Sequence, residues 1–269
     1  MTMEIERITI FGGRGRNGRS EAVERVDIAM GDVVSVVGPT GSGKTTLIND
    51  LELFADANTP SQRRVRINGQ AVPEEWLNDP SLHPIALITQ HTHFLSDLPV
   101  KRFLATHARI RRRSGAGAVV EETLEFANEL TGEPIEPDGA MTGLSGGQTR
   151  ALLIADAVII GHSPIILLDE IENAGIHRTR ALELLREYRK IFIFVTHDPR
   201  IALLSDCRVI MGGGAMQKLI VTADEERRVA GEIGRLDDLM LDFRARIRAG
   251  DQITERMLEQ RLRAIGYVA

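Results

Sequence analysis

A glycine-rich segment, GPTGSGKT at residues 38–45, has the pattern of a loop that binds phosphate groups. It follows the apolar run 33–37 and precedes a segment, 44–54, that we expect to be helical. The glycines let successive backbone N–H groups point at phosphate oxygens, at the positive end of the helix dipole. The residues predicted to bind the phosphates are Gly38, Pro39, Thr40, Gly41, Ser42, Gly43, Lys44, Thr45 and Thr46. Lys44 is expected to reach the β- and γ-phosphates, and the hydroxyl group of Thr45 is expected to bind Mg²⁺.

Two adjacent carboxylates, Asp169 and Glu170, follow the wholly apolar run 165–168. An acid at the end of a buried strand is the residue that holds the metal in a phosphate-transferring site, which assigns Asp169 to Mg²⁺. Glu170 would then polarise an attacking water molecule as a general base. The alternative, an acidic surface turn, fits poorly with so apolar a strand.

A third segment, LSGGQ at residues 144–148, leads into the apolar run 151–160, which we predict to be a helix. Ser145, Gly146, Gly147 and Gln148 would therefore stand at a second helix N-terminus that can face phosphate. Taken alone, the segment is equally explained as a helix cap with a flexible lead-in.

These motifs need a sheet that brings them together. Buried strands are predicted at residues 33–37, 85–89, 165–168 and 191–195, because continuous apolar runs are typical of parallel sheets. Ligands of such sheets bind at the carboxyl ends of the strands. Hairpins are predicted at residues 64–67 with the turn Asn68–Gly69, and at 208–211 and 218–221 around Gly212, Gly213 and Gly214. Residues 91–143 are expected to be mostly helical.

A second glycine-rich loop, GRGRNG at residues 13–18, follows the predicted strand 8–11 and has the spacing of a dinucleotide-binding turn. Such a turn should enter a helix, but residues 26–30 alternate as a short strand does. We therefore predict that this loop is a hairpin turn and that residues 38–45 bind the phosphates. The arginines at positions 14, 16 and 19 either flank the nucleotide or keep the hairpin soluble.

The composition is ordinary for a soluble globular protein, with 43% hydrophobic and 26% charged residues. The features that follow predict a cytoplasmic protein. The sequence contains no apolar run long enough to span a membrane and no signal peptide, and its single cysteine, Cys207, excludes an internal disulfide. The net charge of −5 argues against broad, direct nucleic-acid binding. Short arginine-rich runs at 109–113 and 244–248 are interpreted as solvated helix faces.

The order and spacing of the three motifs resemble the ABC (ATP-binding cassette) ATPases from about residue 4 to residue 221. The resemblance implies an α/β fold of the P-loop NTPase type with a mostly parallel core sheet and an N-terminal antiparallel β-region. It implies an ATPase domain at residues 1–221, with a helical subdomain inserted at about 91–143, and a C-terminal helical extension at 222–269.

The same resemblance implies further site residues. Gln90 would contact Mg²⁺ and the attacking water, and His197 would contact the γ-phosphate and support Glu170. Phe11 is the candidate for stacking on adenine, with a plain core position as the alternative. The family works as a homodimer or as paired subunits, and each ATP lies between the phosphate loop of one subunit and the serine and glycines of residues 145–147 of the other.

Two regions depart from the family pattern. The segment after Glu170 reads IENAGI and lacks the aspartate that the family usually carries there, so Asn173 receives no catalytic role. In the C-terminal extension, apolar residues at helical spacing predict one apolar stripe: Leu236, Leu239, Met240, Phe243 and Ile247. Docking on a partner subunit, regulation and simple capping of the core all remain open for this extension.

Three functions are compatible with the motifs. We favour the ATP-hydrolysing subunit of a membrane transporter, peripheral on the cytoplasmic face and bound to an integral-membrane permease. Its support is the segment after Gln90, which offers apolar residues for such a contact: Phe94, Leu95, Leu98, Val100, Phe103 and Leu104. The second is a soluble mechanochemical ATPase that acts on a protein or cofactor-assembly partner. The third, a nucleotide kinase, shares only the phosphate loop and gives residues 144–148 no role.

Overall fold

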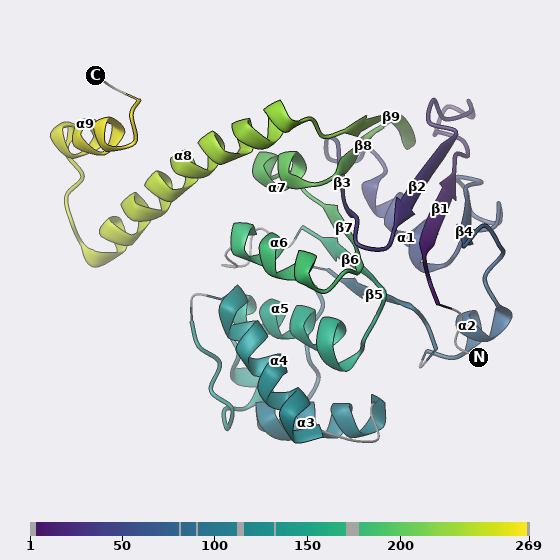
Figure 1. Ribbon diagram of the computed structural model, residues 1–269, viewed down its shortest axis with the longest axis horizontal. Coiled ribbons are helices and arrows are strands. Elements are labelled where there is room, and N and C mark those ends of the chain that lie inside the picture. The colour runs from purple at the N-terminus through teal and green to yellow at the C-terminus, as the bar shows by residue number, and fades with distance from the viewer. Residues whose placement is uncertain are drawn as a thin grey trace.

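The computed structural model describes residues 4–80, 82–89, 91–111, 116–131, 133–170 and 178–267. A six-stranded sheet forms the centre of the chain, and a three-stranded antiparallel sheet lies beside it (Figure 1). The described helices cover the faces of the central sheet or extend from it. This is the α/β architecture with a separate antiparallel β-region that the family resemblance implies.

The central sheet has the strand order β5-β6-β7-β3-β8-β9. Its strands are β3 (Val33–Val37), β5 (Ile85–Ile88), β6 (Ile165–Asp169), β7 (Ile191–Val195), β8 (Cys207–Gly212) and β9 (Ala215–Val221). The first five strands in this order, β5, β6, β7, β3 and β8, pair in parallel. β9 pairs with β8 in the antiparallel sense, as the second predicted hairpin requires. The three central strands β3, β6 and β7 are almost wholly buried because they are covered on both faces.

Successive side chains of these strands point to opposite faces of the sheet and enter two different cores. Ile166 and Phe192 belong to the core beneath the helices α3 to α7. Ile165 and Ile193 belong to the core that α1 (Lys44–Glu52) and the small sheet complete on the other face. Figure 1 shows α3–α6 on one side of the sheet and α1 with β1, β2 and β4 on the other.

The predicted helical segment contains α3 (Val100–Arg111) and α4 (Ala116–Leu130). A short 3₁₀ turn (Met141–Gly143) then precedes α5 (Gly146–Ala155), which continues into a π-helical turn (Asp156–Ile160). The remaining helices of the central part are α2 (Glu74–Asn78), α6 (Arg178–Glu187) and α7 (Pro199–Leu204).

The small sheet has the order β2-β1-β4, with β1 (Arg7–Phe11) between β2 (Arg25–Ala29) and β4 (Arg64–Ile67). The first glycine loop connects β1 to β2, as predicted, and no helix follows it. The prediction that residues 64–67 form a hairpin through the turn at residues 68–69 is wrong, because this strand pairs with a different segment. β4 pairs with β1, and the turn at Asn68 and Gly69 closes only onto Gln70, because Pro73 soon begins a helix instead of a returning strand.

After β9 the chain forms α8 (Asp224–Ala249) and α9 (Glu255–Ala264). Figure 1 shows α8 passing α7 and then leaving the body of the molecule. The predicted apolar stripe is only partly buried: Phe243 is buried, whereas Met240 and Ile247 are more than half exposed. In its far half, α8 contacts α9 through the ion pair between Asp242 and Arg261. Among the described helices, none is both long enough and apolar enough to cross a bilayer.

Candidate nucleotide site

The strand order places three sequence motifs at one edge of the central sheet. β6, β7 and β3 are neighbours and run in parallel, so their carboxyl ends meet at the same edge. Asp169 ends β6 and Glu170 follows it, His197 follows β7, and the phosphate loop follows β3. This is the edge at which open α/β sheets bind their ligands.

The phosphate loop ends at Gly43, which precedes α1 and has a φ of 101°. An L-residue rarely adopts this conformation, and a Cβ atom here would lie 2.8 Å from Cα of Gly214 in the turn between β8 and β9. The amide of Gly214 also donates a hydrogen bond to the carbonyl oxygen of Ser42, at 2.8 Å. The phosphate loop is therefore packed directly against the β8–β9 turn.

The side chain of Lys44 is suited to binding an anion. It is buried, and its Nζ donates hydrogen bonds to the carbonyl oxygens of Gly38 and Pro39, at 2.9 and 3.2 Å. Among the described residues no carboxylate pairs with this ammonium group. A buried cation without a counter-charge is costly, and a phosphate oxygen would supply that charge. Oγ of Ser42 is likewise buried without a hydrogen-bond partner in the described part of the chain.

The residues predicted to bind Mg²⁺ supply few protein ligands. Thr45 is exposed at the start of α1, and Asp169 is half-buried at the end of β6. No group of three His, Cys, Asp or Glu side chains suited to a metal occurs in the described ranges. The oxygen atoms of Thr45 and Asp169 are of the kind that Mg²⁺ takes, and proteins commonly hold this ion through one or two side chains together with substrate phosphates and water. Gln90, the third predicted ligand, lies outside the described residues.

Glu170 and His197 lie side by side at the sheet edge. Nε2 of His197 is 3.4 Å from Oε1 of Glu170, and both side chains are partly exposed. Glu170 has a φ of 50°, and its amide donates a hydrogen bond to the carbonyl oxygen of Val195 at 3.0 Å. A non-glycine residue in the left-handed region is strained, and such strain is concentrated at functional sites. The backbone thus holds the carboxylate beside the imidazole.

Residues 145–148 form a capped helix N-terminus. Oγ of Ser145 accepts a hydrogen bond from the amide of Gln148, and Oε1 of Gln148 accepts one from the amide of Ser145. This capping box satisfies two amides of the first turn. Nε2 of Gln148 also donates to the carbonyl oxygen of Pro134, which fixes the segment in front of α5. Ser145 and Gly146 remain exposed, so this N-terminus is open to a partner.

Phe11 lies at the end of β1, and its ring faces the guanidinium group of Arg25 at 5.7 Å. The neighbours Ile8 and Ile10 point to the core, while Phe11 and Thr9 occupy the other face of the small sheet. Phe11 is therefore not a core residue, and its stacking on adenine stays a prediction. The atypical segment around Asn173 falls within residues 171–177, outside the described part.

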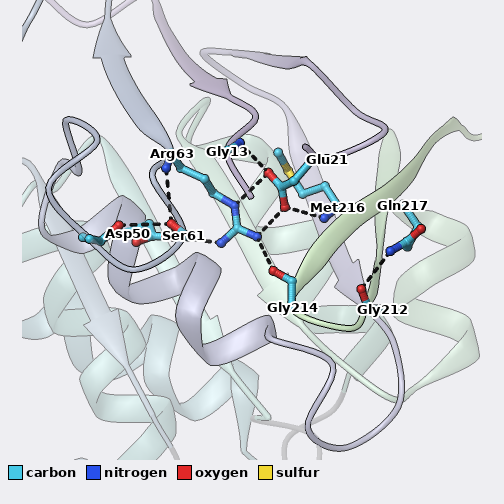
Figure 2. Close-up of polar contacts among 10 residues, drawn as sticks. Gly13, Glu21, Asp50, Ser61, Arg63, Gly212, Gly214, Met216 and Gln217 are labelled. Carbon is cyan, nitrogen blue, oxygen red and sulfur yellow. Dashed lines mark hydrogen bonds and ion pairs between the residues drawn. The ribbon is translucent and has the colours of Figure 1, made fainter. Parts of the chain in front are cut away.

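Sequence reasoning did not single out the most buried charged cluster near this site. Arg63, Glu21 and Asp50 form two ion pairs with wholly or almost wholly buried side chains beside the phosphate loop (Figure 2). Arg63 stands in the polar run SQRRVR, which reads as exposed, and its partners lie 42 and 13 residues away along the chain. No local pattern identifies such a cluster.

Comparison with known proteins agrees with this geometry. The family model described as ABC transporter matches residues 24–173. An uncharacterized ABC transporter ATP-binding protein of Methanocaldococcus jannaschii is 47% identical over 252 residues, which cover 94% of this chain and 96% of that protein. The ATP-dependent lipid A-core flippase of Burkholderia pseudomallei is 32% identical over 81% of this chain, and the match spans 38% of the flippase.

The fold is also that of a solved ATP-binding cassette. The dimeric structure of such a cassette, in a post-hydrolysis state with ADP and Pi, matches with a TM-score of 0.61 and 21% identity, over 80% of this chain and 99% of the other. At that identity the likeness concerns the fold alone. The sequence matches carry the family assignment, and they leave the nucleotide kinase interpretation without support. The chain belongs to the ABC transporter ATP-binding family and is an ABC-type ATPase.

Proposed function

We propose that the protein is the ATP-hydrolysing subunit of a membrane transporter and that residues 38–46, Asp169, Glu170 and His197 form its hydrolytic site. Two groups at one sheet edge carry the site assignment. Lys44 has a buried ammonium group with no carboxylate partner among the described residues, and Glu170 lies beside His197. Phosphate binding and water activation then occur within a single cluster.

Each side chain has a distinct task in this proposal. Lys44 and the backbone N–H groups of residues 40–46 bind the phosphates and stabilise the charge that develops on them. Glu170 accepts a proton from the attacking water, and His197 holds that carboxylate in position and donates to the γ-phosphate. Thr45 and Asp169 would hold Mg²⁺, with Gln90 as the third predicted ligand, and the bound ion neutralises phosphate charge.

The arrangement of α1 and α5 supports a site completed by a second subunit. Both helices begin near the edge that holds the phosphate loop, since α1 follows β3 and α5 precedes β6. Yet α1 packs on one face of the central sheet and α5 on the other. Packed layers are about 10 Å apart, so Ser145 is poorly placed to bind a phosphate held at Gly43 of its own chain. We therefore propose that Ser145, Gly146 and Gly147 bind the ATP of a partner copy.

The transporter role rests on the family and on one exposed segment. Of the apolar residues that follow Gln90, Val100 and Leu104 are fully buried, and Phe94 packs edge-on against Phe103 at 5.2 Å. Val100 and Leu104 therefore belong to the core, and Phe94 and Phe103 pack against it. Leu95, in contrast, is 99% exposed, so it is the residue of this segment best placed to contact a permease. This proposal also places the protein at the cytoplasmic face of a membrane.

The test is co-purification of the tagged full-length protein from its own cells after solubilisation of the membranes. We expect an integral-membrane protein to co-purify, and we expect Leu95→Asp to lose it. Leu53→Asp is the matched control, because Leu53 is 60% exposed at the end of α1 and outside the segment. Recovery of only soluble proteins would contradict the transporter role and would favour the soluble mechanochemical ATPase.

A further inference from the structure

Arg63 is a fully buried arginine that connects four segments around the phosphate loop (Figure 2). Its Nε and Nη2 donate to the two carboxylate oxygens of Glu21, at 3.1 and 2.6 Å. Nη1 donates to Oδ2 of Asp50 at 2.8 Å, and Nη2 also donates to the carbonyl oxygen of Gly214 at 3.0 Å. Burial alone would lower the pKa of Arg63, but the two carboxylates overcome this effect and keep it charged.

Both carboxylates are themselves held by other groups. Glu21 accepts hydrogen bonds from the amides of Gly13 and Met216, at 2.9 and 2.5 Å. Asp50, on α1, accepts one from the hydroxyl of Ser61 at 2.7 Å. The cluster of Glu21, Asp50 and Arg63, here called the arginine brace, therefore joins the first glycine loop, α1, the segment before β4 and the β8–β9 turn.

The brace contacts the phosphate loop through Gly214. This residue accepts a hydrogen bond from Arg63 through its oxygen and donates one to the oxygen of Ser42 through its amide. A Cβ on Gly43 would lie only 2.8 Å from the Cα of Gly214. On the other side of the brace, α1 begins at Lys44 and carries Asp50. The arginine brace thus fixes both the turn that packs on the loop and the helix that follows the loop.

The first glycine loop completes the same arrangement. A Cβ on Gly13 would lie 2.0 Å from the oxygen of Ser61 and 2.6 Å from the amide of Arg63, so only glycine permits this approach. The amide of Arg16 donates to the oxygen of Gly213 at 3.0 Å, so the loop covers the turn from outside. Of the glycines that resemble a dinucleotide-binding turn, Gly13 is explained by packing around the brace and Gly18 by its φ of 75°.

We infer that Arg63, Glu21 and Asp50 are positioning residues that hold the phosphate loop in its binding conformation before ATP arrives. The inference rests on the proposed role of residues 38–46. A preorganised loop loses less entropy when a ligand binds, so a loosened loop binds ATP more weakly. An arginine suits the task because its planar fork reaches several acceptors at fixed angles, which a lysine ammonium cannot do.

The test compares ATP affinity and turnover in matched variants of the full chain. Arg63→Lys keeps the positive charge but loses the planar guanidinium group. Asp50→Asn removes the carboxylate that accepts from Nη1 of Arg63 and leaves the ion pair between Arg63 and Glu21. Losing one charge-assisted hydrogen bond is expected to raise the Kd and KM for ATP by about tenfold. The kcat at saturating ATP is expected to fall much less. Hydrogen exchange in the nucleotide-free variants should accelerate at residues 38–46 and stay unchanged in β6.

Arg208→Lys is the control, because Arg208 forms a partly buried pair with Glu226 on α8, away from the β8–β9 turn. It should lower stability without changing ATP affinity. ATP affinity within twofold of the wild type in folded Arg63→Lys and Asp50→Asn, or an equal loss in Arg208→Lys, overturns the inference. Lys44→Ala distinguishes a failure of the brace inference from a failure of the proposed nucleotide site. If Lys44→Ala abolishes ATP binding while the brace variants bind ATP normally, only the brace inference fails. If Lys44→Ala retains full affinity, the nucleotide site itself is wrongly assigned.

Discussion

The imidazole of His197 lies against the carboxylate of Glu170, with Nε2 3.4 Å from Oε1, although 26 residues separate them in sequence. The contact arises because β6 and β7 are adjacent parallel strands and each residue lies just beyond a strand end. A carboxylate held in this way can accept the proton of a water molecule, while the imidazole keeps it aligned.

Replacing Glu170 by Gln should remove the proton acceptor and leave the phosphate-binding residues intact. The kcat for ATP hydrolysis is expected to fall by about 100-fold or more. The Kd for ATP should not change, because Lys44 and the loop amides are untouched. Phosphate release and equilibrium nucleotide binding measure the two quantities. Glu125→Gln, at an exposed position on α4, is the control and should be fully active. Normal turnover in Glu170→Gln would assign the base elsewhere.

The thiol of Cys207 should react slowly with alkylating and disulfide reagents. Burial, together with the negative charges of Asp32 and Asp206, raises its pKa to about 11, so little thiolate forms at neutral or mildly alkaline pH. A thiol-titration time course checks this in folded protein and after addition of denaturant. Only the denatured protein is expected to react rapidly, and equal rates in both states would contradict the structure.

The attachment of α8 should weaken in acid through Asp206. Burial alone would raise the pKa of this carboxyl. The amide of Val33 and the guanidinium groups of Arg186 and Arg227 outweigh burial and hold the pKa below its ordinary value of 3.8. A depressed carboxyl pKa stabilises the fold above the unfolded value and loses that contribution as the pH falls below it.

The measurement is the free energy of unfolding of wild type and Asp206→Asn as a function of pH. The wild type should be the more stable above pH 3.8, and the difference should shrink as the pH falls further. A difference that stays constant with pH would show that the carboxylate charge is not what stabilises the contact.

Two glycines of α8 distinguish a packed from a free face. A Cβ on Gly234 would meet the guanidinium group of Arg200 on α7, at 2.6 Å from Nη2, whereas a Cβ on Gly231 would meet nothing within 4 Å. Gly231→Ala should raise the free energy of unfolding by about 1 kcal/mol, because glycine is a poor helix former. Gly234→Ala should raise the free energy of unfolding clearly less, since the side chain of Arg200 must move. Equal gains in chemical denaturation would mean that α8 does not pack on α7.

The sequence predicts those parts of the fold in which local pattern and tertiary structure agree. The buried strands at 33–37, 165–168 and 191–195, the phosphate loop and the hairpin from Arg208 to Val221 all lie where the pattern places them. Their apolar runs are continuous, so the local signal already reflects burial on both faces. Motifs at the ends of such strands can be assigned to one sheet edge without knowing the strand order.

Other features depend on contacts between distant residues. The strand at 64–67 was recognisable, but its pairing with β1 follows from the whole small sheet and not from the turn at Asn68. The exposure of Met240 and Ile247 depends on where α8 leaves the core, which an apolar stripe cannot show. Arg63 is the clearest case, since an arginine between Gln62 and Arg64 carries no local sign of burial.

The central claim is that the nucleotide site is completed by Ser145 of a second copy. The most direct test is the molar mass of Glu170→Gln, by size exclusion with light scattering, with and without Mg·ATP. We expect this variant to bind ATP without hydrolysing it, so a dimer should accumulate with Mg·ATP and a monomer without it. Adding Ser145→Arg should abolish the dimer while ATP still binds. A mass that stays monomeric with ATP bound, or a dimer that Ser145→Arg leaves intact, would contradict the account.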